Sequence, residues 1–363
     1  MHTLEPMTTA EILAHRLHNQ RLLGERRQTP ADVVRWLGAV QAQDYPGSLW
    51  AVCLRAGDGG EEAVEKAVRD RRIVRTWPMR GTLHFVPAPD ARWMLALLGR
   101  RPVARAAAMH RRMGIDAATV SRAARVANRA LHGGKHLARG ALYRLFASAR
   151  LPVDGQRGIH ILWLLAHRGL ICFGPRAGTE HTFALMEEWL PEAPTPARDV
   201  ALATLAERYF ASHGPATVRD FAWWSGLPVT EAREGLELVK SRLTGAGSNG
   251  DRLWMTPSSA RPAPGGTLLL PAFDEYMVGY TDRGAPLERS RSREIPVTMA
   301  QALSPVIVRD GMVIGTWKRT RRKDRVIVTP RFFVTGSRRD RRAFDEAAEL
   351  YGRSIGLPVT VSE

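Results

Sequence analysis

Several features that mark other classes of protein are missing from this chain of 363 residues. It has only two cysteines, Cys53 and Cys172, and they have neither zinc-site spacing nor the density of a disulfide framework. No apolar run approaches the roughly 18 residues that a membrane span needs. The first twenty residues lack the apolar stretch of a secretory signal. We therefore expect a reduced, cytoplasmic protein with no membrane contact.

Common cofactor motifs are missing as well. The histidines do not show metal-site spacing such as His-Glu-x-x-His. No Walker loop or dinucleotide-type glycine loop occurs. We therefore predict neither a metal nor a cofactor.

Lysine is scarce, but arginine is abundant. Five of the 53 basic residues are lysine, and with 36 acidic residues the formal net charge is +17. A charge of this size favours a polyanionic partner, either nucleic acid or an anionic membrane surface. The basic residues concentrate in two windows, residues 100–150 and 283–342, and two such windows favour nucleic acid.

One probable helix in the first window presents a row of arginines. Arg122, Arg125 and Arg129 share one of its faces. The other face is apolar: Val120, Ala124, Ala127 and Leu131. Such a helix can pack on its own protein and offer guanidinium groups to DNA phosphates. The alternative is an ordinary solvated face.

The length of the chain suggests two or three compact units. Helices are expected over 8–23, 30–41, 47–55 and 61–70, and two strands over Ile73–Trp77 and Thr82–Val86. A second segment combines helices 139–149 and 158–168 with a hairpin of Leu170–Phe173 and His181–Leu185. Helix, turn, helix and hairpin form the winged-helix pattern.

The same pattern returns after the proline-rich linker 191–198. Helices 197–212, 217–225 and 229–240 precede two short strands around the glycine-rich stretch 245–250. The rest of the chain is more β-rich, with strands at 267–271, 304–309, 312–318 and 325–330 and a helix over 337–354. We expect an α+β protein with four segments: 1–138, 139–196, 197–265 and 266–363. The first three are expected to be winged-helix units, and the alternative is that some of them only scaffold the others.

Four segments of the chain carry a resemblance to a known family. They are QAQDYPGSLWAVCL (41–54), TWPMRGTLHFVPAPD (76–90), LLLPAFDEYMVGYTDR (268–283) and VIVRDGMVIGTWKR (306–319). Together and in this order they resemble the AlkZ and YcaQ group of winged-helix DNA glycosylases. The resemblance implies three tandem winged helices in a C shape around a basic channel. It also implies a monomer that acts on double-stranded DNA containing an alkylated purine.

The resemblance also implies a reaction and a catalytic pair. Members of the group excise N7-alkylated purines, and several unhook interstrand crosslinks. The catalytic signature is Gln-x-Gln in the AlkZ branch and Gln-x-Asp in the YcaQ branch, so Gln41 and Gln43 indicate the AlkZ branch. That branch is associated with self-resistance in organisms that make DNA-alkylating natural products. No lysine occupies a matching position, so we expect a monofunctional hydrolase that leaves an abasic site.

A glutamine pair suits this chemistry if the chain leaves helical geometry. Side chains at i and i+2 lie about 200° apart on a helix and cannot converge there. Pro46 prevents a smooth helix and biases Tyr45 to an extended conformation. We therefore place Gln41 and Gln43 at or just after the end of helix 30–41. Helix capping or surface polarity is the alternative role for the pair.

Further residues are candidates for DNA or pocket contacts. Arg80, His84, Arg176 and His181 are expected to contact DNA, although Arg80 could be an ordinary turn residue and His84 a satisfied strand residue. The possible pocket residues are Asp44, Trp50, Asp274 and Tyr276. Asp44 is assigned a structural role, and the residues near 274 could instead pair with arginines. The competing function is a winged-helix transcriptional regulator, which would typically dimerise on a palindromic site.

Overall fold

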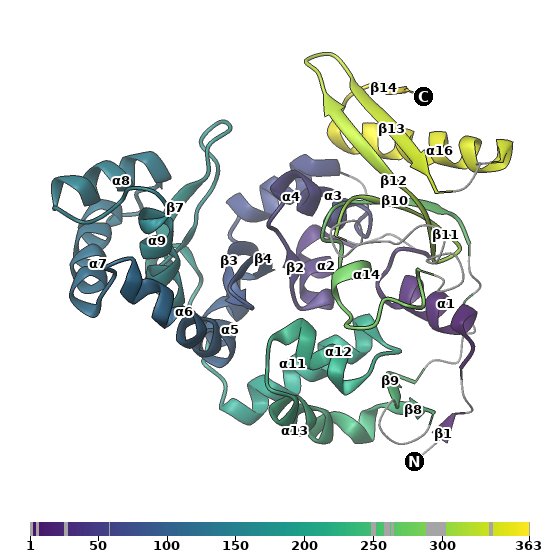
Figure 1. Cartoon of the computed structure of the whole chain (residues 1–363), viewed down its shortest axis with the longest axis horizontal. Helices are drawn as coiled ribbons and strands as arrows, with labels where there is room; N and C mark the ends of the chain where they lie inside the picture. Colours follow the sequence, from purple (N-terminus) through teal and green to yellow (C-terminus); the bar gives the residue numbers. More distant parts are fainter. Residues whose placement is uncertain are drawn as a thin grey trace. The chain divides into compact units, whose positions relative to one another are not determined.

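The computed structural model describes residues 3–4, 7–24, 28–57, 59–247, 252–257, 262, 265–287, 303–333 and 337–362. The fold is mixed α and β, as predicted (Figure 1). Contacts divide the chain into two compact units. Unit 1 comprises Met1–Val64 and Leu202–Glu363, and unit 2 comprises Glu65–Ala201. The two boundaries between the units fall inside α4 (Gly60–Arg69) and α11 (Arg198–His213). The four segments expected from the sequence divide the chain differently, and that division remains a prediction.

Unit 1 begins with helices whose starts are set by local side chains. In α1 (Thr9–Asn19) and α2 (Pro30–Leu37), a threonine before the helix and an acid three residues later form a reciprocal capping box. Each box satisfies backbone N–H groups that the first turn leaves unpaired. The two-residue strand β2 (Val40–Gln41) and helix α3 (Tyr45–Cys53) follow.

The connection between α2 and α3 differs from the sequence prediction in its details. The helix expected over 30–41 ends at Leu37, because Gly38 adopts a φ of +80°. The next helix begins at Tyr45 with Pro46 in its first turn, where the missing N–H of proline costs nothing. The expected extended conformation of Tyr45 is therefore wrong. Asp44 is extended instead, with φ −89° and ψ 98°.

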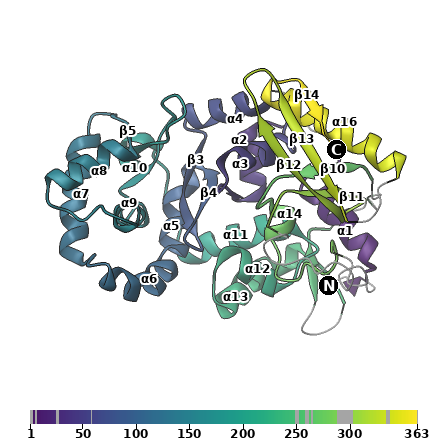
Figure 2. The ribbon, with the colours of Figure 1, turned by 45° about the horizontal axis from the view of Figure 1, so that its top comes forward.

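A five-stranded sheet forms the C-terminal part of unit 1, in the order β10-β11-β12-β13-β14. Its strands are Thr267–Leu270, Val306–Arg309, Met312–Arg321, Val326–Phe332 and Val359–Val361. Neighbours are antiparallel except for the parallel pair β13 and β14. Helix α16 (Arg338–Ile355) packs along one face of the sheet (Figures 1 and 2). The predicted strands and last helix are confirmed, although β12 runs three residues further than predicted, to Arg321.

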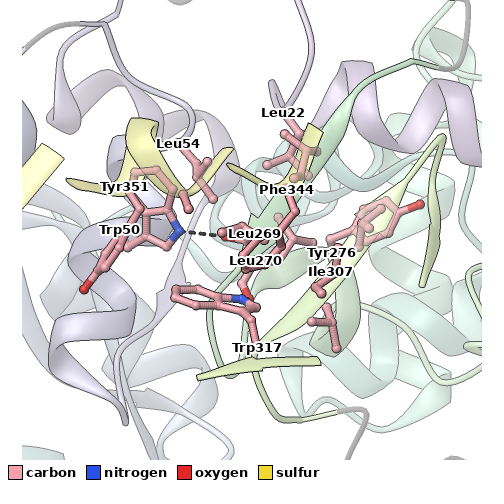
Figure 3. Close-up of a cluster of buried hydrophobic side chains, with 14 of the residues drawn as sticks. Leu22, Trp50, Leu54, Leu269, Leu270, Tyr276, Ile307, Trp317, Phe344 and Tyr351 are labelled. Atoms are coloured by element: carbon pink, nitrogen blue, oxygen red, sulfur yellow. Dashed lines mark hydrogen bonds between the residues drawn. The ribbon is translucent and has the colours of Figure 1, made fainter. Parts of the chain in front are cut away.

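One indole ring joins this sheet to α3, and a second links two strands of the sheet. Trp50 donates its Nε1–H to the carbonyl of Leu269 at 2.7 Å, and Trp317 donates to the carbonyl of Leu270 at 2.8 Å. Tyr351 of α16 packs edge-on against both indoles (Figure 3). These aromatic side chains bury large apolar areas and also satisfy their own polar atoms.

The remaining described elements of unit 1 are a helical group and a small sheet. Helices α11, α12 (Val218–Ser225) and α13 (Val229–Val239) precede η2 (Lys240–Arg242), β8 (Thr244–Ala246) and β9 (Leu253–Met255), as predicted. The N-terminal strand β1 (Thr3–Leu4) pairs in parallel with β8. The short helix α14 (Glu275–Val278) follows β10. Residues 248–250 of the glycine-rich stretch lie outside the described residues.

Unit 2 contains two hairpins and six complete helices among its described residues. The first hairpin joins β3 (Ile73–Met79) to β4 (Thr82–Pro87). After it come η1 (Ala88–Asp90), α5 (Ala91–Leu98), α6 (Arg100–Arg112), α7 (Ala117–Leu131), β5 (Leu137–Ala138), α8 (Arg139–Ser148) and α9 (Arg157–His167). The second hairpin, β6 (Ile171–Phe173) with β7 (Thr182–Leu185), and α10 (Met186–Trp189) complete the unit. The predicted second helical segment and its hairpin are thereby confirmed. In the described part of both units, no helix is long and apolar enough to cross a membrane.

Candidate active site

The glutamine pair lies in the short connection between α2 and α3. Gln41 ends β2, and Gln43 follows in a bend. Val40 and Ala42 are buried, whereas Gln41 is half-buried and Gln43 is exposed. Residues two apart in an extended segment point to the same side. The alternating burial therefore places both glutamines on the outer side of the segment, away from the core.

Gln41 is held by its backbone rather than by its side chain. Its N–H donates to Oε1 of Glu275 at 2.9 Å. Its side-chain oxygen Oε1 is inaccessible to solvent and has no hydrogen-bond partner in the part of the chain that the structure describes. The peptide is thus fixed, and the amide oxygen keeps an unused capacity to accept a hydrogen bond.

Asp44 forms an ion pair beside the two glutamines. Its Oδ2 accepts from Nη2 of Arg319 on β12 at 3.2 Å. The carboxylate does not cap α3, although Asp44 stands at the N-cap position. It lies so close to Gly47 that a Cβ added there would be 2.5 Å from Oδ2. The Asp44 carboxylate therefore links strand β12 to the connection between α2 and α3.

The other expected pocket residues are buried. Trp50, Asp274 and Tyr276 are each 1% exposed. The Tyr276 hydroxyl donates to the carbonyl of Gly311 at 2.8 Å. Asp274 pairs with Arg55 at 2.7 Å, and both side chains are fully buried. Pairing with an arginine, the alternative for Asp274, is what the structure shows.

Comparison with known proteins identifies the family of this chain. A family model described as DNA glycosylase AlkZ-like matches residues 34–354. The chain belongs to the AlkZ-like DNA glycosylases. It is 27% identical over 371 residues to the interstrand DNA cross-link repair glycosylase of Streptomyces sahachiroi, covering 97% of this chain and 98% of that protein. The solved structure of Streptomyces sahachiroi DNA glycosylase AlkZ matches with a TM-score of 0.78 and 27% identity, over 98% of this chain and 100% of that chain.

This AlkZ-like glycosylase is therefore an enzyme that hydrolyses N-glycosyl bonds and acts on DNA. The alternative prediction, a non-enzymatic transcriptional regulator, is therefore wrong. Within the described ranges, no group of three or more His, Cys, Asp or Glu side chains could hold a metal ion.

In unit 2 of the glycosylase, helix α7 presents the predicted arginine row. Arg122, Arg125 and Arg129 are exposed. Val120, Ala127 and Leu131 are buried on the opposite face, and Ala124 is half-buried. Asp116 caps the helix at its N-terminus by accepting from the N–H of Thr119 at 2.7 Å. The predicted division of this helix into an apolar and a basic face is confirmed.

Arg80 and His84 act as a pair in the β3-β4 hairpin. Arg80 occupies the turn with a φ of +56°, followed by Gly81 at +75°. His84 is fully buried, and its Nδ1 lies 2.9 Å from the carbonyl of Thr82. Only an N–H can satisfy that carbonyl, so Nε2 is the acceptor that receives Nη2 of Arg80 at 3.1 Å. The His84 ring therefore orients the Arg80 side chain, and His84 itself has no solvent-exposed surface.

Arg176 and His181 lie around the β6-β7 turn. Arg176 Nη1 pairs with Oε1 of Glu65 at 2.9 Å. Burial lowers the pKa of His181 to about 4, and the nearby arginines Arg75, Arg176 and Arg139 lower it further. His181 is consequently neutral at physiological pH and brings no positive charge to a phosphate.

The sequence alone did not single out Arg319, and it offered Glu275 only as a residue that lines a pocket or pairs with an arginine. Glu275 contacts Gln41 across 234 positions, and Arg319 contacts Asp44 across 275. Both lie in segments that carry the family resemblance, 268–283 and 306–319. That membership was the available signal, but no local pattern reveals which residues they contact.

Proposed function

We propose that this glycosylase hydrolyses the N-glycosidic bond of N7-alkylguanine in duplex DNA, with Gln41 and Gln43 as its catalytic residues. The buried, unpaired Oε1 of Gln41 carries the proposal. A buried acceptor without a donor costs about 1–3 kcal/mol, and such a group calls for a functional explanation. Rotation of the amide about its terminal bond exchanges its oxygen and nitrogen. The oxygen can thereby turn toward a water or a cationic sugar.

The chemistry of the leaving group explains why an amide pair suffices. Glycosidic cleavage passes through an oxocarbenium-like sugar. An N7-alkylguanine is already cationic and leaves as a neutral base, so no strong general acid is required. The amide oxygens of Gln41 and Gln43 can accept hydrogen bonds from water, and their dipoles stabilise positive charge at the anomeric carbon. A glutamine cannot take up a proton, so the pair orients water without deprotonating it.

Asp44 has a structural role in this proposal. Its pairing with Arg319 supports that role, because one carboxylate oxygen, Oδ2, is held by a guanidinium group. The residue fixes the turn from the glutamine pair into α3. We assign it neither proton transfer nor contact with the reacting sugar.

The DNA-binding part of the proposal rests on repeated helical segments and exposed arginines. Three segments, 1–138, 139–196 and 197–265, are interpreted as winged-helix units of a monomer. In the second, α8 and α9 precede the β6-β7 hairpin, which supports this interpretation. The Streptomyces sahachiroi relative is named for interstrand cross-link repair. We propose that bulky natural-product adducts, including crosslinks, are substrates here too, in self-resistance.

The decisive experiment is incubation with a duplex that contains one N7-alkylguanine, followed by alkali to reveal abasic sites. Wild-type protein should release the base without cutting the strand. Gln43→Ala and Gln41→Ala should each lower the single-turnover rate at unchanged DNA affinity. Asp44→Asn is the matched control, since it lies next to Gln43 and should keep most of the rate.

Two outcomes would count against the proposal. Absence of base release from several small and bulky N7 adducts would remove the substrate class. An Asp44→Asn variant that loses as much rate as Gln43→Ala would move the chemistry from the glutamines to the carboxylate.

A further inference from the structure

Glu275 is a fully buried carboxylate that the proposed chemistry leaves without a role. Its side chain is 0% exposed. Oε1 accepts the backbone N–H of Gln41 at 2.9 Å. Oε2 accepts Nε1–H of Trp224 at 3.0 Å and lies 3.4 Å from Nε2 of His213. The carboxylate thus links the catalytic connection to α12 and α11.

Both oxygens of Glu275 accept hydrogen bonds inside the core. The backbone N–H and the indole N–H are neutral donors. Burial lowers the pKa of His213, although the hydrogen bond with Glu275 acts in the opposite direction. A buried ionised carboxylate is expensive unless its oxygens accept hydrogen bonds, and here both oxygens do.

We propose that Glu275 is a positioning residue for the glycosylase reaction. Its carboxylate fixes the Gln41 peptide, and it places a negative charge behind the glutamine pair. The transition state gains positive charge on the sugar. In a buried setting such a charge acts more strongly than it does in water. This inference rests on the catalytic role proposed for Gln41.

The arrangement requires a carboxylate and not an amide. Both oxygens of Glu275 face N–H donors, from Gln41 on one side and from Trp224 on the other. An amide has one acceptor and one NH2 group. In a Glu275→Gln variant, the NH2 group must therefore face one of these donors, and either the Gln41 peptide or the indole loses its partner.

The matched control is Asp220, another buried carboxylate of unit 1. It is 2% exposed, and it accepts from the backbone N–H groups of Thr217 at 2.9 Å and Thr281 at 2.8 Å. Asp220→Asn makes the same carboxylate-to-amide change without touching Gln41. Comparing the two variants separates a general loss of buried hydrogen bonds from a specific effect on the glutamine pair.

The test measures the single-turnover rate and the DNA dissociation constant on an N7-methylguanine duplex, below the thermal midpoint of each variant. Glu275→Gln should lower the rate by about tenfold or more, the scale of a lost electrostatic contribution, with the dissociation constant within about twofold of wild type. Asp220→Asn should keep its single-turnover rate within about threefold of wild type, even if its thermal midpoint falls as much as that of Glu275→Gln. Equal rates for the two variants would overturn the inference.

Two further measurements keep the outcomes distinct. If Glu275→Gln does not fold, Trp224→Phe removes one donor to the carboxylate and keeps an aromatic ring. Its rate should fall several-fold at unchanged DNA affinity, and an unchanged rate would overturn the inference. If Gln41→Ala keeps the full rate, the proposed catalytic pair fails. If Gln41→Ala loses rate while Glu275→Gln behaves like Asp220→Asn, only the role of Glu275 fails.

Discussion

The Arg55 side chain is the clearest place to test how unit 1 is held together. It is 1% exposed, and its guanidinium group donates to three partners. Nη1 and Nη2 reach the two Asp274 oxygens at 2.9 and 2.7 Å. Nε and Nη2 reach the backbone and side-chain oxygens of Gln20 at 2.9 and 3.0 Å, and Nη1 also reaches the carbonyl of Ala51 at 2.8 Å. The group therefore joins α1, α3 and the segment before α14.

Replacing Arg55 with methionine keeps much of the volume and removes the charge. The Asp274 carboxylate then stays buried without its cation. Breaking one partner from a buried pair costs about 3–5 kcal/mol, because an uncompensated charge is left in the interior. For a unit the size of unit 1, each kcal/mol shifts the thermal midpoint by about 2–4 °C. We therefore expect the midpoint to fall by about 6–20 °C.

The assay is a thermal melt followed by circular dichroism, at pH 7.5 and fixed protein concentration. Arg325→Met is the control, because Arg325 pairs with Asp324 in an exposed position, where the two side chains are 50% and 70% exposed. Exposed pairs contribute little, so that midpoint should move by no more than about 1 °C. If Arg55→Met lowers the thermal midpoint no more than Arg325→Met does, the conclusion that the buried Arg55 contacts stabilise unit 1 is refuted.

Three further predictions concern pH, backbone spacing and DNA binding. Burial lowers the pKa of His167 to about 4. The unfolded chain takes up this proton near pH 6.5. Stability should therefore be constant above about pH 6.5, fall as pH drops toward about 4, and fall less in His167→Gln, as measured by melts across this range. Gly47→Ala should displace the Asp44 carboxylate and break its pair with Arg319, because the new Cβ would lie 2.5 Å from Oδ2. The thermal midpoint should fall by about 2–4 °C, the scale of about 1 kcal/mol for a partly exposed pair, while most of the single-turnover rate is kept, as in Asp44→Asn. Arg125→Ala should weaken DNA binding and reduce its logarithmic salt slope by about 0.9, if this exposed side chain neutralises one phosphate.

Each of these predictions has its own control. An unchanged pH dependence in His167→Gln would show that this ring does not titrate between the two states. Gly265→Ala should leave the thermal midpoint unaltered, because a Cβ there meets nothing within 4 Å among the described atoms. Arg342 is 86% exposed and pairs with Glu346 on α16, and Arg342→Ala should leave the salt slope unchanged. An equal change of slope in both arginine variants would remove any special role of α7.

Much of the local structure follows from short-range patterns in the sequence. The spacing of apolar residues predicted the buried face of α7, because helical periodicity alone brings Val120, Ala127 and Leu131 together. Four of the five strands of the C-terminal sheet and α16 were predicted within a few residues, whereas β14 was not predicted. The pattern was less reliable at Pro46, because a proline can either end a helix or occupy its first turn, and only the neighbouring conformation decides.

The amino-acid sequence by itself thus determined the arginine-rich surface, the order of helices and strands, and the glutamine pair with its family-like surroundings. Tertiary structure alone decided which groups act on that pair. Glu275 meets the Gln41 peptide and Arg319 meets Asp44 only after segments more than 200 residues apart have packed together. Tertiary structure also placed Trp50 and Tyr276 in the core, where their polar atoms bond to backbone carbonyls. Such contacts depend on long-range packing and burial, which no local periodicity encodes.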